Sequence, residues 1–235
     1  GSGDGLAHVK TELKRGNVRL LAISSTQFQT GLHLPIEALA KLCHQHDAEI
    51  LVDGAQSMGI VPIDVQAQGI DYMAAPTHKW MMGVEGGGVL YVNPKAMEKL
   101  VLRRSGWLSH EDGLGFLFQG PNLLRYDRPI VAKPRVVEVG ASNSIGFAGL
   151  EAGLAPIVHL GQRTIFDHVQ KLHDQLEPHL IELGFESLRA KDHAARSGIL
   201  SVRPPKGLCV TTLGPRISEQ NVQLSIPDGL IRIAP

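Results

Sequence analysis

Short apolar segments alternate with longer segments of helical periodicity over the first part of the chain, and this alternation constrains the fold more than any other feature. Each apolar segment is bounded by polar residues, as buried strands are, and the four segments span 20–24, 49–53, 71–75 and 88–92. Between the first two, Pro35 opens a stretch with one apolar face, formed by Ile36, Leu39, Leu42 and Cys43. Strand–helix–strand units of this length predict an α/β fold with a mostly parallel sheet and flanking helices. Ligands of such sheets bind beyond the carboxyl ends of the strands.

A long irregular segment follows the last of these strands. Residues 103–143 are rich in Gly, Pro and Arg, and we interpret them as an excursion from the sheet. The pattern then becomes helical over 144–183, with perturbations expected at Gly161 and Pro178, because neither residue favours a helix interior.

The end of the chain predicts a smaller α+β unit. A strand at 198–202, a short polar helix near Ser218 and a final strand at 230–234 make up its pattern. We therefore predict two domains: a partial large ligand-binding domain at 1–160 and a small C-terminal domain at 161–235.

Composition and charge exclude several classes of function. Basic and acidic residues number 23 each, so the chain lacks the electrostatic footprint of a protein that binds nucleic acid or an anionic membrane. No apolar run approaches the length of a membrane span, and residues 1–5 do not resemble a signal peptide. The eleven His residues lack metal-ligand spacing, so no metal site is expected. Only two cysteines, Cys43 and Cys209, are present, which favours a reduced, cytoplasmic compartment.

An acid and an amine follow neighbouring strands of the predicted sheet. Asp53 ends the second strand, and Lys79 lies 26 positions later, just beyond the third. Pyridoxal 5′-phosphate (PLP) needs such a pair, because a lysine amine must form the Schiff base and a carboxylate must keep the pyridine nitrogen protonated. Gln56, Thr77 and His78 lie beside these two residues and can supply further polar contacts.

These residues carry a resemblance to a known family. The segment 52–92, which contains Val52-Asp53-Gly54-Ala55-Gln56 and Thr77-His78-Lys79-Trp80, is similar to the PLP segment of class V aminotransferases. That family includes cysteine desulfurases, kynureninase-like lyases and isopenicillin N epimerase-like proteins. The segments Gln27-Phe28-Gln29-Thr30-Gly31 and Leu123-Leu124-Arg125-Tyr126-Asp127 look closest to the epimerase-like branch. The resemblance implies the fold type I of PLP-dependent transferases and a homodimer.

The resemblance also implies roles for individual residues in cofactor binding. Lys79 would carry PLP as a Schiff base and then move a proton, Asp53 would pair with the pyridinium nitrogen, and Gln56 would bond the phenolic oxygen. His78 would contact the phosphate or lie near the Schiff base, and Thr77 would be a phosphate ligand.

Arg232, in Ile231-Arg232-Ile233, matches the family's arginine that binds a substrate carboxylate, for which a bidentate guanidinium is well suited.

The sequence departs from the family pattern at several points. Pro76 stands where many relatives have Ser, and Ser142 follows Gly140-Ala141 where the family often has Gly-Thr. Relatives also have well over a hundred residues before the strand at 20–24, so we expect this chain to lack the N-terminal part of the large domain. Gly86-Gly87-Gly88 is interpreted as a tight turn into a strand, because it lacks the Lys-Ser/Thr ending of a phosphate loop.

Three functions remain open from the sequence. The first is a PLP-dependent enzyme acting on a small amino acid by transamination or epimerisation. The second is a C–S or C–C lyase of the desulfurase or kynureninase kind, which is disfavoured because Cys209 precedes Arg232 by 23 positions and Cys43 lies on the apolar face of a helix. The third is an inactive PLP-fold fragment that binds a partner through its uncovered sheet.

Overall fold

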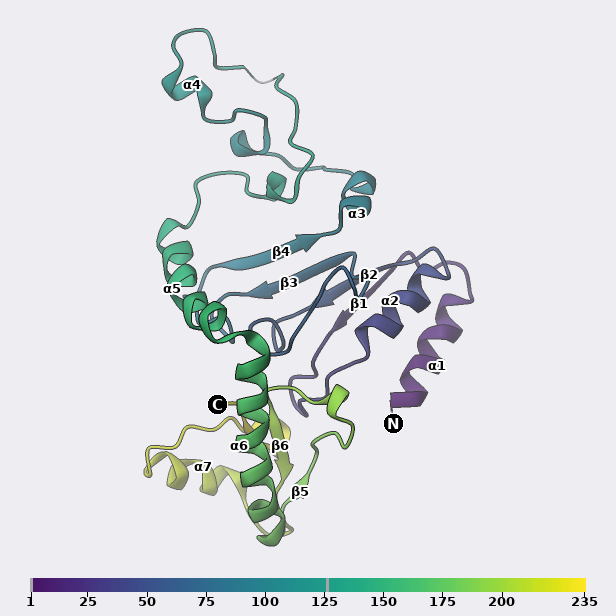
Figure 1. Cartoon of the computed structure of the whole chain (residues 1–235), viewed down its shortest axis with the longest axis vertical. Coiled ribbons are helices and arrows are strands. Elements are labelled where there is room, and N and C mark those ends of the chain that lie inside the picture. The colour runs from purple at the N-terminus through teal and green to yellow at the C-terminus, as the bar shows by residue number, and fades with distance from the viewer. Residues whose placement is uncertain (1, 126) are drawn as a thin grey trace.

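The computed structural model describes residues 2–125 and 127–235. Tyr126, which belongs to the segment that resembles the epimerase-like branch, lies outside the described residues. The chain forms a larger unit around a four-stranded sheet and a smaller unit around a three-stranded sheet, joined by a long helix (Figure 1).

The larger sheet has the strand order β1-β2-β3-β4, and these strands span Leu20–Ser24, Glu49–Asp53, Tyr72–Pro76 and Gly88–Val92. The first three strands are parallel, which confirms the expected mostly parallel sheet, and Ser24 of β1 pairs with Asp53 of β2. The fourth strand is antiparallel to β3. Its direction follows from the connection 77–87, which is a loop without a helix and too short for a crossover between parallel strands.

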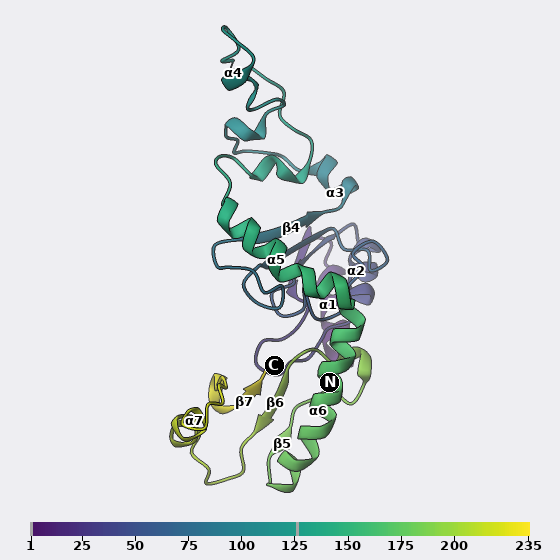
Figure 2. The ribbon, with the colours of Figure 1, turned by 60° about the vertical axis from the view of Figure 1, so that its left-hand side comes forward.

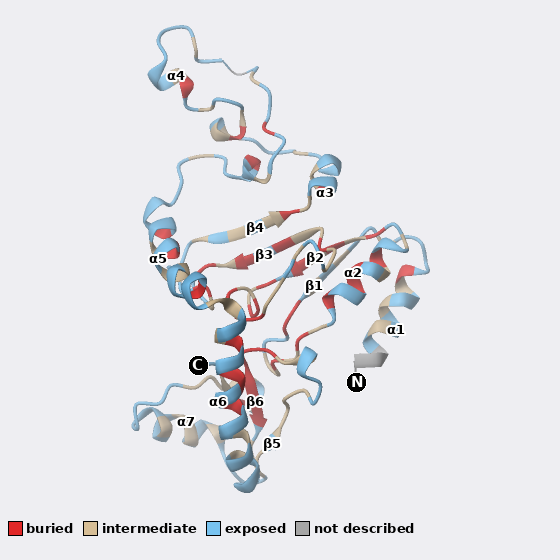
Figure 3. Cartoon of the chain, in the orientation of Figure 1, coloured by how far each residue is buried: buried red, intermediate tan, exposed pale blue. Residues whose placement is uncertain are grey.

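Helices α1 (Ser2–Leu13) and α2 (Ile36–His44) cover one face of this sheet. The apolar face that the sequence predicts for α2 is buried through Ile36, Leu39 and Cys43, together with Ala40. These side chains pack with the interior residues of β2 and β3 in one core, which Figure 3 shows as buried positions on the strands and on the inner side of α2.

The irregular segment extends away from the sheet as a separate excursion (Figure 1). The short helix α3 (Pro94–Lys99) precedes it, and the segment itself holds the short helix α4 (Gly115–Phe118) and two 3₁₀ turns at Trp107–Ser109 and Pro134–Val137. Most of its residues are exposed (Figure 3), in agreement with the absence of any periodic apolar pattern there.

Two consecutive helices connect the larger unit with the smaller one. Helix α5 (Ser144–Leu160) and helix α6 (Gln162–Glu182) meet at an angle of 81°, at Gly161 with φ of 81° (Figure 2). Pro178 lies inside α6 without ending it. Among the described helices, none is long and apolar enough by itself to cross a membrane, and this bent pair meets the criterion only by length and composition.

The smaller sheet is antiparallel, in the order β5-β6-β7, and its strands span Glu186–Ser187, Leu200–Arg203 and Ile231–Ile233. Helix α7 (Val210–Ser218) and the second half of α6 pack against it. The first half of α6 packs instead on Ile60 and Val61 of the larger unit. Helix α6 therefore belongs to both units, and the domain boundary at residue 160 stays a prediction.

Candidate active site

Three of the polar residues singled out from the sequence line one cavity. Lys79, Gln56 and Arg232 come from distant parts of the chain and border a space of about 450 Å³. The remaining lining is mostly apolar and includes Phe28, Ile60, Trp80, Met82 and Ile165. A cavity with a few convergent polar groups in an apolar wall is the usual form of a small-molecule site.

Asp53 lies at the carboxyl end of β2, with an exposed side chain. Both of its carboxylate oxygens accept a hydrogen bond: Oδ2 from the hydroxyl of Ser24 at 2.9 Å, and Oδ1 from the backbone N–H of Ala55 at 2.8 Å. The carboxylate is therefore held in one orientation at the strand end where ligands of parallel sheets bind.

Lys79 and His78 are both exposed on the loop 77–87 that joins β3 to β4. The loop is fixed against the turn that carries Gln56, because Gly59, with φ of 102°, lies against the backbone of Trp80. A Cβ at Gly59 would come within 2.6 Å of the Trp80 carbonyl, so only glycine permits this approach. This packing places Lys79 and Gln56 at the same cavity.

The role of Thr77 as a phosphate ligand stays a prediction, and its hydroxyl has partners of its own in the structure. The side chain is buried and donates to the carbonyl oxygen of Val84 at 2.8 Å, with that of Gly87 also within reach at 3.1 Å. A hydroxyl has one proton to donate, and here it is directed into the loop. Thr77 thus stabilises the loop that carries Lys79.

Arg232 is brought to the cavity by β7 and is held by several partners. Its Nη2 donates to Oε1 of Gln56 at 3.0 Å, its Nε to the carbonyl of Phe28 at 3.0 Å, and its Nη1 to the hydroxyl of Ser225 at 3.3 Å. The guanidinium carbon lies 5.0 Å from the centre of the Phe28 ring. Burial lowers the pKa of Arg232 from its usual range, but an arginine stays charged in a protein.

The loop between β1 and α2 joins the two units at this site. Its backbone carbonyls accept hydrogen bonds from the smaller unit: that of Gln29 from Ser201 Oγ at 2.6 Å, and that of Gly31 from Ser197 Oγ at 2.7 Å. Gly31 also permits close approach, since a Cβ there would lie 2.6 Å from the carbonyl oxygen of Ile199.

Sequence reasoning missed three residues that shape the site, namely Ser24, Phe28 and Ser225. Of these, Ser24 could have been found, because parallel pairing of the strands 20–24 and 49–53 puts their last residues side by side. The contacts of Phe28 and Ser225 with Arg232 depend on tertiary folding and leave no signal in the spacing.

Ser142 lies in a different cavity, of about 250 Å³, which it shares with Thr77 and with Gly86-Gly87-Gly88. The next residue, Asn143, caps α5 by accepting a hydrogen bond from the N–H of Gly146 at 3.0 Å. The glycine triplet forms the entry to β4, in agreement with its interpretation as a turn.

Cys209 does not belong to the described lining of the cavity that holds Lys79. It is exposed, directly before α7, with its Sγ 2.9 Å from the hydroxyl of Thr211. Hydrogen bonds from that hydroxyl and from the N–H groups of Thr212 and Thr211 lower the pKa of the thiol to about 7. Cys43 is buried in α2, where burial and then the charge of Asp71 raise the pKa of its thiol.

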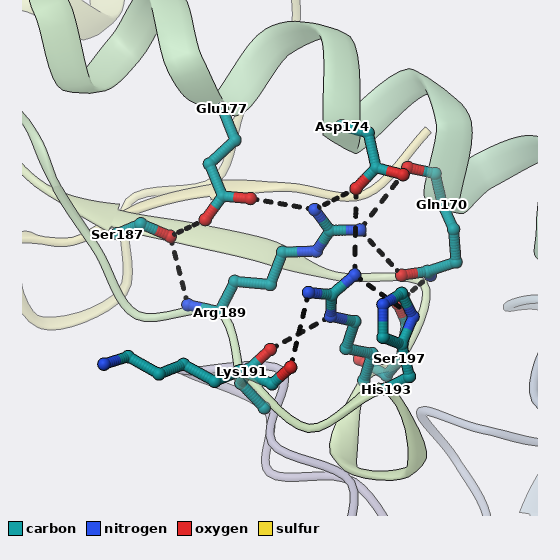
Figure 4. Close-up of polar contacts among 10 residues, drawn as sticks. Gln170, Asp174, Glu177, Ser187, Arg189, Lys191, His193 and Ser197 are labelled. Atoms are coloured by element: carbon teal, nitrogen blue, oxygen red, sulfur yellow. Dashed lines mark hydrogen bonds and ion pairs between the residues drawn. The ribbon is translucent and has the colours of Figure 1, made fainter.

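A second polar cluster lies in the smaller unit, on the side of α6 that faces the segment after β5 (Figure 4). Arg189 is almost fully buried there and donates to Asp174 at 2.7 Å, to Glu177 at 2.8 Å and to Gln170 Oε1 at 2.9 Å. None of these four residues lines the cavity of Lys79 within the part of the chain that the structure describes. No group of His, Cys, Asp and Glu among the described residues forms a metal site.

Comparison with known proteins identifies the family. The chain matches the aminotransferase class V family over residues 4–225. It is 25% identical over 216 residues to an uncharacterized aminotransferase of Bacillus subtilis, YcbU, a match that covers 92% of this chain and 54% of that protein. It is 36% identical over 154 residues to a cysteine desulfurase of Klebsiella pneumoniae, covering 66% of this chain and 36% of that protein.

The fold is also found in solved structures. The apo structure of a cysteine desulfurase from Thermococcus onnurineus NA1 matches with a TM-score of 0.82 and 23% identity, over 97% of this chain and 57% of that chain. The matched region thus covers between about one third and somewhat more than half of the length of these proteins.

The chain belongs to the aminotransferase class V family of PLP-dependent proteins. The expected family, the fold type I architecture and PLP as the cofactor are thereby confirmed. The relatives above are an aminotransferase and desulfurases, so the epimerase-like branch stays a prediction.

Proposed function

We propose that the chain is part of a PLP-dependent enzyme that acts on a small amino acid, by transamination or epimerisation. The observation that carries the proposal is the cavity bordered by Lys79, Gln56 and Arg232, with the exposed carboxylate of Asp53 at the neighbouring strand end. An amine, a carboxylate and a guanidinium are the groups that this chemistry requires of a protein.

The side chains present fit PLP at its ring and at its reactive carbon. Asp53 would pair with the pyridinium nitrogen, Gln56 would contact the phenolic oxygen, and Lys79 would hold the cofactor covalently. At the phosphate, His78 is exposed and available, whereas the hydroxyl of Thr77 is directed into its own loop. When bound, PLP withdraws electrons from the Cα of the amino acid and so weakens the bonds to that carbon.

The protein's residues would then bind the substrate and move its proton. Three of the five N–H groups of Arg232 are directed to Gln56, Phe28 and Ser225, which leaves one on each Nη for the substrate carboxylate. Lys79 borders the same cavity and would take the Cα proton and return it.

The assembly and the location of the protein belong to this proposal. We expect a homodimer, as the class V resemblance implies, and a cytoplasmic location, which the two unpaired cysteines support. Size-exclusion chromatography with light scattering measures the first, and a mass of one chain at micromolar concentration would contradict it.

The cofactor site is tested by absorbance with added PLP, followed by borohydride reduction and peptide mapping. The wild-type chain is expected to turn yellow and to carry the reduced label on Lys79. The variant Lys79→Ala should lose the label, while Lys41→Ala, which removes an exposed lysine of α2, should keep it. A colourless wild-type chain, or a label elsewhere, would contradict the proposal for this chain.

A lyase of the desulfurase kind is the second candidate function. The 36% identity to a cysteine desulfurase and the lowered pKa of the exposed Cys209 thiol favour it, whereas Cys209 does not line the cavity of Lys79, which speaks against it. In this reaction cysteine becomes alanine and its sulfur forms a persulfide on the thiol, from which an added thiol reductant releases sulfide. Formation of alanine and sulfide in the presence of the reductant that disappears in Cys209→Ser would support this reaction, and formation that persists in the variant would exclude a role for this cysteine.

A further inference from the structure

The carboxylate of Asp53 is exposed, and such a side chain ordinarily samples several orientations. Here each oxygen has its own donor, Ser24 Oγ for Oδ2 and the N–H of Ala55 for Oδ1. The hydrogen bond from the Ala55 N–H joins residues only two positions apart, as in a common turn of the backbone. This single bond does not fix the plane of the carboxylate. The contact that comes from outside the turn is the hydroxyl of Ser24.

The sheet places Ser24 at this position. Parallel pairing of β1 and β2 sets Ser24 opposite Asp53, and both side chains are on the exposed side at the end of their strands. The next residue, Ser25, holds the backbone of Asp53: its N–H and its hydroxyl both donate to the Asp53 carbonyl, at 2.9 and 3.1 Å. Two consecutive serines therefore fix the main chain and the side chain of one aspartate.

We propose that Ser24 is a positioning residue that directs the carboxylate of Asp53 toward the pyridinium nitrogen of PLP; this proposal rests on the function proposed above. A carboxylate whose two oxygens each have one donor keeps its remaining lone pairs in a fixed direction, away from those donors. A charged partner gains from such preorganisation, because the carboxylate need not be ordered when the cofactor binds.

The first test measures the dissociation constant of PLP for the wild-type chain and for Ser24→Ala, Ser24→Thr and Asp53→Asn. Ser24→Ala is expected to weaken PLP binding about 3- to 10-fold, the range for a hydrogen bond to a charged group that water can partly replace. Ser24→Thr keeps the hydroxyl and should bind within about twofold of the wild type. In the Asp53→Asn background the effect of Ser24→Ala should shrink, because Ser24 acts through that carboxylate.

A matched control separates positioning from general loss of stability. Ser218→Ala makes the same chemical change at an exposed serine at the end of α7 and should leave PLP binding unchanged. Equal PLP binding by Ser24→Ala and the wild type, or an undiminished effect of Ser24→Ala in the Asp53→Asn background, would overturn the proposal.

The second test needs no cofactor and therefore stands apart from the proposed function. Side-chain scalar couplings of Asp53, measured by nuclear magnetic resonance, should show one χ1 rotamer in the wild type and rotamer averaging in Ser24→Ala. Averaging already in the wild type, or one rotamer in both proteins, would overturn the positioning role. Failure of the wild type to bind PLP would instead contradict the proposed function, while the rotamer result would still decide the role of Ser24.

Discussion

The two cysteines of the chain have opposite environments, and their reactivity should differ accordingly. Cys43 is fully buried in α2, and burial raises the pKa of its thiol. Cys209 is exposed, and hydrogen bonds, first of all with the hydroxyl of Thr211, lower the pKa of its thiol to about 7. The thiolate is the reactive form, so a large fraction of Cys209 is reactive at neutral pH.

We predict that iodoacetamide alkylates Cys209 much faster than Cys43 in the native protein, with a rate that rises most steeply around pH 7. Thr211→Val should move this rise to higher pH, because it removes the hydrogen bond between the Thr211 hydroxyl and the sulfur, which lowers the pKa of the thiol most. The rates can be measured by mass spectrometry of quenched samples. An unchanged pH profile in Thr211→Val, or equal rates at both cysteines, would contradict this account.

Thr77 illustrates how a residue type that suits a cofactor can be used for the fold. Its hydroxyl is buried and directed to the carbonyls of Val84 and Gly87, within the loop that carries Lys79. We predict that Thr77→Val lowers the free energy of unfolding by about 0.5–1.5 kcal/mol, because the hydrogen bond that the buried hydroxyl donates within its loop is lost. Thr77→Ser retains the hydroxyl and should lose less. Urea unfolding measures both, and equal stability of Thr77→Val and the wild type would assign the hydroxyl to another role.

At the scale of single elements, α6 carries an unusual buried base. His173 is 1% exposed, and neither imidazole nitrogen has a hydrogen-bond partner among the described residues. Burial, and then the charge of Arg189, lower the pKa of His173 to about 4. The folded protein therefore holds this imidazole neutral at pH values where the unfolded chain protonates it.

The consequence for stability follows from proton linkage. The unfolded state binds a proton at His173 below about pH 6.5, and the folded state does so only near pH 4, so stability falls as the pH decreases through this window. We predict a loss of up to about 3 kcal/mol between pH 7 and pH 4 from this residue. His173→Leu should remove this part of the pH dependence, whereas His168→Leu, at an exposed position of the same helix, should retain it.

Urea unfolding at several pH values measures the difference between these variants. The pKa of Asp174 is lowered chiefly by its hydrogen bond with Arg189. For Glu177 burial is the largest influence and raises the pKa, but the hydrogen bonds with Ser187 and Arg189 and the charges of Arg189 and Arg196 together outweigh it, so this pKa is lowered too. The two carboxylates stabilise the folded state at neutral pH, and this stabilisation is lost at lower pH. It is present in the wild type, in His173→Leu and in His168→Leu alike. The same pH dependence in His173→Leu and His168→Leu would show that His173 does not contribute.

Several elements could be predicted from the sequence because their apolar pattern decides their structure. The strands at 20–24, 49–53 and 88–92 have the predicted bounds, and the third strand is displaced by one residue. The apolar pattern of β4 carries no information on its direction, and the signal for the antiparallel pairing is instead the short connection 77–87, which leaves no room for a crossover helix. Pro178 perturbs a helix in isolation, but α6 continues through it, since tertiary packing of the helix outweighs local propensity.

At the scale of the whole molecule, the candidate site is formed where the two units meet. Arg232 of the smaller sheet reaches Gln56 of the larger unit, across 176 positions of the chain. The residues Asp53, Gln56 and Lys79 could be found from a compact motif, and Arg232 from its local match to the family. Several of the other links between the units are hydrogen bonds from side chains to backbone carbonyls, and such contacts leave no pattern in the sequence.

The hydroxyls of Ser197 and Ser201 are two of these links, and each is directed to a carbonyl of the loop between β1 and α2. Both serines are buried, so removal of either hydroxyl leaves an acceptor without its donor. We predict that Ser197→Ala and Ser201→Ala each lower the free energy of unfolding by about 1–3 kcal/mol. We also expect faster hydrogen exchange in the segment 27–33, because the loop is then less firmly attached to the smaller unit.

Hydrogen exchange with mass spectrometry distinguishes this attachment from a general loss of stability. If the two hydroxyls join the units, exchange should increase in the segment 27–33 and in β7, whose Arg232 also bonds this loop, before it increases in β2 at the centre of the larger sheet. Ser218→Ala, an exposed serine of the smaller unit, is the matched control and should leave both segments unchanged. A uniform increase over the whole chain in Ser197→Ala and Ser201→Ala would mean that the two units unfold as one body and that these hydroxyls stabilise it globally.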